Sequence, residues 1–303
     1  MAISRGQLVK ELEPGLNALF GLEYKRYENQ HAEIYTTESS DRAFEEEVML
    51  SGFAQAQTKS EGAGVTFDNA QETYTARYTH ETVALAFSIT EEAIEDNLYD
   101  RLASRYTKAL ARSMANTKQV KAVAPLINGL PTNDAFDSGD GVSLFNTAHP
   151  TIAGTVKNTL TTQADLNETS LEQSLIDIAA MTDERGLRIA ARGLKMIIPS
   201  ELQFTAERLM KSQGRTGTAD NDINAIVSMG MIPQGYRVNN YLTDSDAYYI
   251  LTDIPNGMKM FNRSPLKTAM EGDFDTGNVR YKARERYSFG VSDPRGIYGV
   301  AGA

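Results

Sequence analysis

One long helical pattern constrains the fold of this chain more than any other feature. Apolar or aromatic residues recur at every fourth position, which is the spacing of one helix face. These positions are Ile94, Leu98, Leu102, Tyr106, Leu110 and Met114. A capping box at residues 88–91 precedes the pattern, and Pro125 lies beyond it as the predicted stop. The pattern predicts a helix of about 35 residues, roughly 50 Å long, with Leu102 and Leu110 buried.

A strand pattern precedes this helix. Residues from Glu72 to Ile89 are rich in Thr, Tyr, Val and Phe, and Tyr74, Ala76 and Tyr78 alternate with polar neighbours. Further upstream, the run from Gln55 to Gly64 contains almost only small and polar residues, as is typical of a mobile loop tip. Together these segments predict a long hairpin-like excursion between about residues 50 and 88.

The N-terminal segment has the pattern of an amphipathic helix. Its apolar face contains Leu8, Leu12, Leu16 and Leu19. Pro14-Gly15 interrupts the pattern and should bend or split the helix. Such a helix needs a partner surface, and the sequence shows none within its own chain.

An α/β region follows the Gly-, Asn- and Asp-rich connection after the long helix. It begins with a helix predicted to turn its apolar side chains inward, namely Leu171, Leu175, Ile178 and Ala179. The apolar run 194–198 is predicted to be a strand, and Pro199-Ser200 to open a second helix. We expect a compact sheet-and-helix unit.

The C-terminal part is predicted to contain short strands around residues 236–241, 247–253 and 258–261, and a longer strand over 279–289. The even positions of the long strand form a cationic face of Arg280, Lys282, Arg284 and Arg286. This face could contact DNA, or it could pair with an acidic segment such as Glu45-Glu46-Glu47. Solvation at the surface remains the commonest role of such a run.

Charge and composition exclude several classes of protein. The formal charge of -10 and the pI near 5.0 argue against tight, dedicated DNA binding. The chain has no cysteine, which removes disulfides, thiolate metal sites and cysteine nucleophiles. The first 20 residues lack the long apolar core of a signal peptide or membrane anchor. We expect a cytosolic protein of about two domains.

Motifs for catalysis are absent from the sequence. The histidines His31, His80 and His149 lie far apart, and no HExxH, phosphate-binding glycine loop or GxSxG elbow occurs. We interpret His149 as a loop residue that satisfies a backbone carbonyl. The acidic clusters around residues 134–140, 220–222 and 273–275 could bind a hard cation, but turn formation is the simpler interpretation. We predict no catalytic, cofactor or metal site, and a hydrolase is the alternative from a different class.

The order of these parts resembles the major capsid proteins of tailed bacteriophages with the Hong Kong 97 type fold. Two segments are similar to Mu-like phage head subunits: residues 143–150 (SLFNTAHP) and residues 286–296 (RYSFGVSDPRG). The similarity in layout spans nearly the whole chain. The resemblance implies an α+β fold with an N-terminal arm, an extended loop (E-loop), a long spine helix in a peripheral domain and an inserted α/β axial domain.

The implied domain boundaries place the arm at residues 1–47 and the E-loop at 48–88. The peripheral domain takes 89–135 and 258–303, and the axial domain takes 136–257. The residues expected to contact other subunits are Lys59, Glu61, Gly62, Gly64, Arg77, Arg280, Lys282, Arg284 and Arg286.

The resemblance also implies partners and location. The chain is expected to assemble with itself as hexamers and pentamers into an icosahedral virion shell around double-stranded DNA, in the host cytoplasm and without a membrane. A portal and a separate scaffolding protein are expected, because arm-like sequence begins at once and no fused scaffolding segment precedes it. An encapsulin, a compartment shell of the same fold, is the nearest alternative.

Overall fold

The computed structural model describes residues 5–90, 92, 99–133, 135–214, 222–273 and 277–303, and describes only the backbone for 5–13 and 99–102. Its helices are α1 (Arg5–Arg26), α3 (Tyr99–Asn128), α4 (Glu168–Ala180), α5 (Gln203–Lys211) and α6 (Ala225–Met229). Its strands are β1 (Thr36–Ser39), β2 (Phe44–Leu50), β3 (Glu72–Thr79), β4 (Glu81–Ile89), β5 (His149–Thr151), β6 (Gly154–Val156), β7 (Gly193–Ile198), β8 (Tyr236–Val238), β9 (Tyr248–Thr252), β10 (Met258–Gly272), β11 (Val279–Val291) and β12 (Ile297–Val300). The mixture is an α+β fold, as the resemblance implies.

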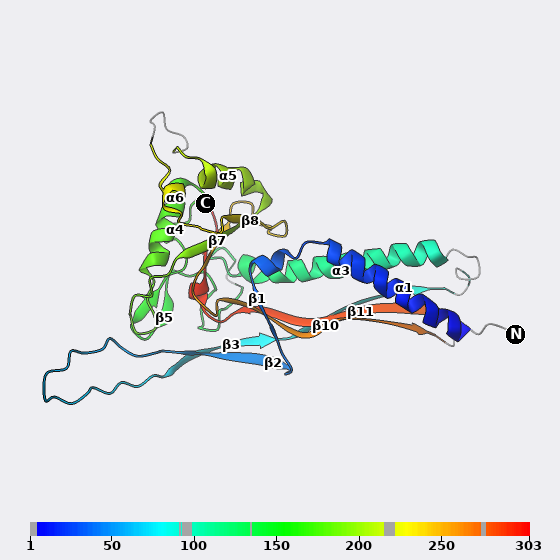
Figure 1. Ribbon diagram of the computed structural model, residues 1–303, viewed down its shortest axis with the longest axis horizontal. Coiled ribbons are helices and arrows are strands. Elements are labelled where there is room, and N and C mark those ends of the chain that lie inside the picture. The colour runs from blue at the N-terminus through cyan, green and yellow to red at the C-terminus, as the bar shows by residue number, and fades with distance from the viewer. Residues whose placement is uncertain (1–4, 91, 93–98, 134, 215–221, 274–276) are drawn as a thin grey trace.

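Two four-stranded sheets organise the chain. The first has the order β1-β10-β11-β4, and its two long strands β10 and β11 run antiparallel from the pair Met258–Val291 to the pair Gly272–Val279. The second has the order β12-β9-β7-β8 and lies with α4, α5 and α6 at one end of the molecule (Figure 1). Because β12 closes the chain within the second sheet, the C-terminus returns to that unit.

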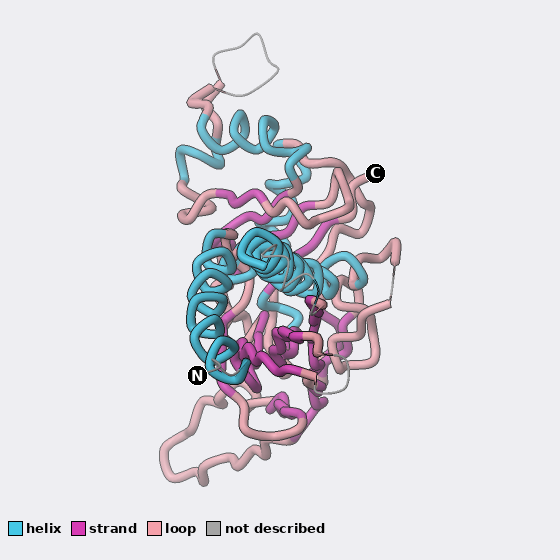
Figure 2. Tube along the Cα trace, turned by 90° about the vertical axis from the view of Figure 1, so that its right-hand side faces the viewer, coloured by secondary structure: helices cyan, strands magenta, loops and turns pink. Residues whose placement is uncertain are grey.

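Helices α1 and α3 cover one face of the first sheet, and the view along α3 in Figure 2 shows the two helices side by side. Leu16 and Phe20 of α1 pack with Leu110 and Met114 of α3 and with Tyr281 of β11 in one buried cluster. The expectation that the N-terminal helix lacks a partner in its own chain is therefore wrong. The helix is also continuous across Pro14, so it is not split there.

The long predicted helix is present as α3, but its end differs from the prediction. The helix continues through Pro125 to Asn128. Proline removes one backbone hydrogen bond, yet Val123 and Leu126 are buried on either side of it, and this packing fixes the last turn. Leu110 is buried as predicted, whereas Tyr106 is 49% exposed and lies on the flank. The sites at 91, 94 and 98 and the Leu102 side chain lie outside the described residues.

The α/β unit follows the prediction with one correction. Asn167 caps α4 through a reciprocal pair of hydrogen bonds with Ser170. Leu171 and Ile178 are buried as expected, but Ala179 is exposed, because the inward position is taken by Asp177, which accepts a hydrogen bond of 2.8 Å from the Tyr298 hydroxyl. The strand β7 and the helix α5 are confirmed near their predicted positions.

A separate two-stranded ribbon projects from this body. Strands β2 and β3 pair antiparallel from Phe44–Thr79 to Leu50–Glu72, and the chain between them extends beyond the α/β unit (Figure 1). The predicted strand of residues 72–89 is divided at His80, because β3 belongs to the ribbon while β4 pairs with β11. The hairpin-like excursion is thus confirmed, with β2 rather than β4 as the partner of β3.

Candidate assembly surface

The outer part of the β2–β3 hairpin exposes large apolar side chains. Phe67 is 94% exposed and Phe53 is 60% exposed, and both lie in the extended segment 51–71 between the strands. On the ribbon itself, Val48 and Leu50 also face solvent. Isolated apolar residues are ordinary on a surface. Several of them along the β2–β3 hairpin, which we call the hairpin arm, point to a contact with another surface.

The predicted contact residues of the loop tip lie in the same segment. Lys59, Glu61, Gly62 and Gly64 are exposed and belong to no helix or strand. Gly62 has a φ of +79°, a left-handed conformation that favours glycine. The structure therefore places these four residues at the end of the arm and away from the body.

Arg77, also predicted as a contact residue, lies on β3 and has partners in its own chain. Its guanidinium stacks 4.1 Å from the centre of the Phe44 ring and lies 3.8 Å from a carboxylate oxygen of Glu46. All three side chains are substantially exposed, so these contacts add little stability. They do orient the arginine on the outside of the ribbon.

The inner end of the β2–β3 hairpin, which we call the hairpin root, is fixed to the two-sheet body of the molecule by a network around Glu47. Glu47 accepts a 2.5 Å hydrogen bond from Lys259 of β10 and another from the Ser292 hydroxyl. The Tyr78 hydroxyl lies 2.5 Å from the Ser292 hydroxyl, and Tyr74 donates to the backbone carbonyl of Ser292. The two strands of the arm are thus bonded to the segment that follows β11.

The cationic face of β11 is present as predicted. Arg280, Lys282 and Arg284 are exposed and Arg286 is half-buried, whereas the alternate residues turn inward, namely Tyr281, Ala283, Glu285 and Tyr287. Arg280 pairs with Asp273 at 2.5 Å. Lys282 and Arg284 form no ion pair with any residue that the structure describes.

The acidic block Glu45-Glu46-Glu47 does not neutralise this face within one chain. Glu45 accepts from Ser40, Glu46 lies beside Arg77, and Glu47 binds Lys259. The suggested pairing between the block and the cationic strand is therefore wrong for contacts within a subunit. The reason is that β2 pairs with β3 in the hairpin, whereas the strands on either side of β11 are β10 and β4.

A buried ion pair on the inner side of β11 was not predicted from the sequence. Glu285 is almost fully buried, and Lys118 of α3 lies 3.3 Å from one of its oxygens, to which Tyr24 of α1 also donates. Burial raises the pKa of Glu285 against the opposing effect of Lys118. The sequence did not predict burial of Glu285, because this residue alternates with basic residues in a run that is typical of a charged surface.

A second buried ion pair joins the C-terminal segment to the α/β unit. Arg295 donates two hydrogen bonds of 2.8 and 2.9 Å to Asp293 and lies 3.4 Å from Glu184. Its guanidinium also reaches the sulfur of Met49 on β2 at 3.7 Å. Burial raises the pKa of Glu184 despite the nearby Arg295. This group ties the hairpin root to the segment after β11.

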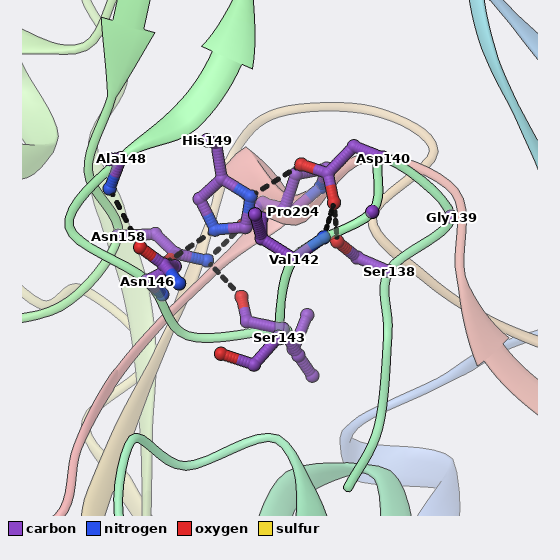
Figure 3. Close-up of polar contacts among 12 residues, drawn as sticks. Ser138, Gly139, Asp140, Val142, Ser143, Asn146, Ala148, His149, Asn158 and Pro294 are labelled. Carbon is purple, nitrogen blue, oxygen red and sulfur yellow. Dashed lines mark hydrogen bonds and ion pairs between the residues drawn. The ribbon is translucent and has the colours of Figure 1, made fainter. Parts of the chain in front are cut away.

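His149 lies in a buried polar network (Figure 3) and does not bind a backbone carbonyl, which corrects the sequence interpretation. Its Nδ1 lies 2.6 Å from Asp140, and its Nε2 lies 3.0 Å from the side-chain oxygen of Asn158. The Asn158 amide donates to the carbonyls of Leu144 and Pro294, so its oxygen must accept. Burial opposes ionisation of Asp140, but hydrogen bonds from His149 and Ser138 outweigh it and lower the pKa of Asp140. The network joins the loop before β5 to the segment that follows β11.

The other two histidines are also bound in separate places. His31 contacts Gln119 of α3, and burial, followed by the charge of Lys118, lowers its pKa to about 4. His80 bridges Ser40 and Ser288. Among the described residues, no group of three or more His, Asp or Glu side chains could hold a metal ion. None of the described helices is long and apolar enough to span a membrane.

Comparison with known proteins links this geometry to shells. A family model described as phage capsid protein matches residues 73–300. No curated protein matches the sequence.

Solved structures of assembled particles resemble the chain over most of its length. The virus-like particle from Pyrococcus furiosus is 10% identical, with a TM-score of 0.55, over 95% of this chain and 98% of that one. The capsid of the empty GTA particle is 14% identical, with a TM-score of 0.57, over 90% and 89% of the two chains. The capsid of Myoviridae phage XM1 is 11% identical, with a TM-score of 0.54, over 89% of each. At these identities the likeness establishes a shared fold.

Proposed function

Since this chain belongs to the phage capsid protein family and is a structural subunit of a capsid shell, we propose that it is the subunit that builds an icosahedral head around double-stranded DNA. The subunits assemble as hexamers and pentamers, with a portal and a separate scaffolding protein as further partners. Assembly takes place in the host cytoplasm. The chain itself performs no catalysis in this role.

The observation that carries the proposal is the exposure of the hairpin arm, which consists of β2, β3 and segment 51–71. The arm holds Phe53, Val65 and Phe67 away from every core cluster of the described chain. Burying a phenylalanine side chain is worth about 1.5–3 kcal/mol, and the arm forgoes this gain within one subunit. A neighbouring subunit can supply the missing cover, and repetition of that contact by symmetry closes a shell.

The parts of the fold take the following roles in this proposal. The β2–β3 hairpin with segment 51–71 is the E-loop, α3 is the spine helix, and the long strands β10 and β11 with α3 form the peripheral domain. The α/β unit around β7 and β9 is the axial domain that gathers at the centre of each capsomer. Residues 1–47, which include α1, are the N-terminal arm, and the packing of α1 on α3 supports a role close to its own subunit.

The contact residues divide into two groups. Lys59, Glu61, Gly62 and Gly64 lie at the tip of the arm and reach a neighbour, with Arg77 on its flank. The β11 cations Arg280, Lys282, Arg284 and Arg286 lie on the open face of the first sheet and contact protein rather than the genome. The net charge of -10 supports this assignment, since a shell of such subunits attracts DNA poorly.

The proposal is tested by replacing residues 55–64 with a short Gly-Ser turn. The purified protein should keep its thermal transition, because the segment contributes almost no apolar area to a core. Electron micrographs should show no shells of this variant, and light scattering should show no large assemblies. The wild type should form both at high concentration or with its scaffold. Normal shells from the shortened chain would contradict the role of the arm.

An encapsulin-like compartment is the second candidate, and the likeness to the virus-like particle from Pyrococcus furiosus favours it. The two functions differ in content. A head shell packages DNA with the help of a portal, whereas a compartment shell encloses cargo protein. Protein and nucleic-acid analysis of particles isolated from the native source distinguishes them.

A further inference from the structure

Two arginines meet across a β-bulge on the open face of the first sheet. The register of β10 against β11 places Asn262 opposite Tyr287 and Ser264 opposite Arg286, so Arg263 is the extra residue on β10. A bulge sets two residues of one strand against one residue of its partner. Arg263 and Arg286 are therefore cross-strand neighbours, and both are half-buried.

Among the described residues, neither arginine has a hydrogen-bond or ion-pair partner. The Nε atom of each is buried and makes no hydrogen bond, and neither guanidinium forms an ion pair with a residue of the described chain. A guanidinium carries five N–H donors and stays charged at every physiological pH. Two such groups held side by side repel each other and leave donors unused, which is unfavourable unless an anion joins them.

His80 responds to the positive potential of this pair. Ser40 donates its hydroxyl to Glu45 at 2.7 Å and must therefore accept from Nε2 of His80 at 2.8 Å. Nδ1 lies 2.9 Å from the Ser288 hydroxyl, which can donate to it when the ring is neutral. Burial, followed by the charge of Arg286, lowers the pKa of His80; Glu45 opposes the shift and Arg263 adds to it.

We propose that Arg263 and Arg286 form a binding site for an oxyanion, and that its occupant in the assembled shell is a carboxylate side chain of a second copy of this chain. The inference rests on the proposed function. A carboxylate matches the fork of a guanidinium with two parallel hydrogen bonds. It would supply the acceptors that the two arginines lack.

Charge complementarity selects a second copy as the source. Each chain carries 40 acidic and 30 basic side chains, so the surface of a neighbouring subunit is predominantly acidic. The arginine pair continues the row of Lys282 and Arg284 on β11, with Lys267 opposite Arg284 on β10. This open face therefore has the sign opposite to that of the molecule as a whole and attracts another copy.

The site is tested first on the unassembled full-length chain, with sodium sulfate and sodium acetate as probes against sodium chloride at equal ionic strength. His80 is the reporter, because the chain has only three histidines and their ring signals can be assigned by NMR. An oxyanion beside the arginines should raise the pKa of His80. The double variant Arg263→Gln/Arg286→Gln should raise it without added anion and abolish the response.

The control variant Lys108→Gln removes one exposed cation from α3, which covers the opposite face of the first sheet, so it should respond as the wild type does. The variant Arg286→Lys preserves the charge and tests whether the fork of the guanidinium is needed. Circular dichroism checks the folding of each variant. Equal responses of the wild type and the double variant would overturn the site, and a response at molar salt only would mark an adventitious ion only.

Assembly then identifies the occupant. The double variant should form few shells under conditions in which the wild type and Lys108→Gln form many. If the wild type forms shells and the double variant forms them equally well, the inference fails while the proposed function stands. If the wild type forms none, the proposed function fails, and the His80 titration still decides the anion site. Salt-sensitive binding of duplex DNA that the double variant loses would assign the site to DNA and overturn the second-copy occupant.

Discussion

The molecule contains two antiparallel ribbons of similar design and opposite surroundings. In β10–β11, the inward residues Tyr281 and Tyr287 are buried beneath α1 and α3. In β2–β3, Ala76 and Tyr78 pack against Phe261 of β10, but Val48 and Leu50 on the other face remain exposed. A two-stranded ribbon is at best marginally stable alone. The comparison shows that strand pairing and side-chain alternation are shared, whereas stability within one subunit comes from the covering helices.

The two ribbons also use charge differently. Between the helices and β11, Glu285 and Lys118 form a buried pair that needs both members. At the hairpin root, Glu47 and Lys259 fix the direction in which the arm leaves the body. Beyond this root the arm has few fixed contacts, one of them from Arg185 of the α/β unit to Asp68 at 3.2 Å. The buried carboxylate of the body is thus paired within the chain, whereas the outer part of the β2–β3 hairpin is oriented at its root and exposed beyond it.

The largest loss of stability is expected when the buried pair of the covered ribbon is broken. Lys118→Met leaves the Glu285 carboxylate without its cation in the interior, and removal of one partner of a buried pair typically costs about 3–5 kcal/mol. Denaturant unfolding measures the loss. The double variant Lys118→Met/Glu285→Leu removes the stranded charge and should recover most of the stability.

The pH dependence of Lys118→Met sharpens this prediction. The pKa of Glu285 is raised in the native state, so the native protein binds its proton more readily than the unfolded chain. Stability from this group therefore decreases as pH rises above the ordinary value near 4.5. The loss in Lys118→Met should be smaller at pH 5 than at pH 7. An equal loss at both pH values would contradict a stranded carboxylate.

The next effect concerns apolar packing under α3. Leu110→Ala empties a buried site in the cluster with Phe20 and Tyr281 and should destabilise the protein by about 2–5 kcal/mol. Val120→Ala is the matched control, because Val120 lies on the same helix and is 48% exposed. Its cost should stay within about 0.5 kcal/mol. Similar losses in the two variants would mean that the buried face of α3 has been misassigned.

The sequence predicts the covered ribbon and its helix well, since α3, β11 and the alternation of Arg280 to Arg286 follow from periodicity alone. The sequence does not predict that α1 packs over this ribbon. The surface to which a helix binds depends on contacts between residues far apart in the chain, such as Phe20 with Tyr281. Glu285 was missed because its neighbours in the sequence are arginines, and only its contact with Lys118 of α3 shows that it is buried. The Arg263 bulge has no signature in the sequence, so the arginine pair is visible only in the register of the strands.

For the uncovered ribbon, changes should affect assembly and leave folding almost unchanged. Phe53→Ser/Phe67→Ser removes apolar side chains that make no core contact, so the free energy of unfolding should change by less than about 0.5 kcal/mol. Shell formation should fall sharply, because the neighbour loses the apolar surface that it buries. Light scattering and electron microscopy measure the second effect. A large loss of stability with intact shells would reverse the distinction between the two ribbons.

The smallest expected effect is at His80, the residue that joins the two ribbons. Its neutral ring connects Ser40, ahead of β2, to Ser288 of β11, and its pKa is lowered there by burial and by Arg286. A histidine with a lowered native pKa contributes stability that is complete above its ordinary value near 6.5 and is lost as pH falls below it. Acid should therefore loosen the hairpin root by about 1 kcal/mol, the net worth of a hydrogen bond. Hydrogen exchange of the β3 amides between pH 7 and pH 5, corrected for intrinsic rates, measures this effect. His80→Gln, which cannot gain a proton, should remove the pH dependence, whereas the same dependence in that variant would place the acid-sensitive group elsewhere.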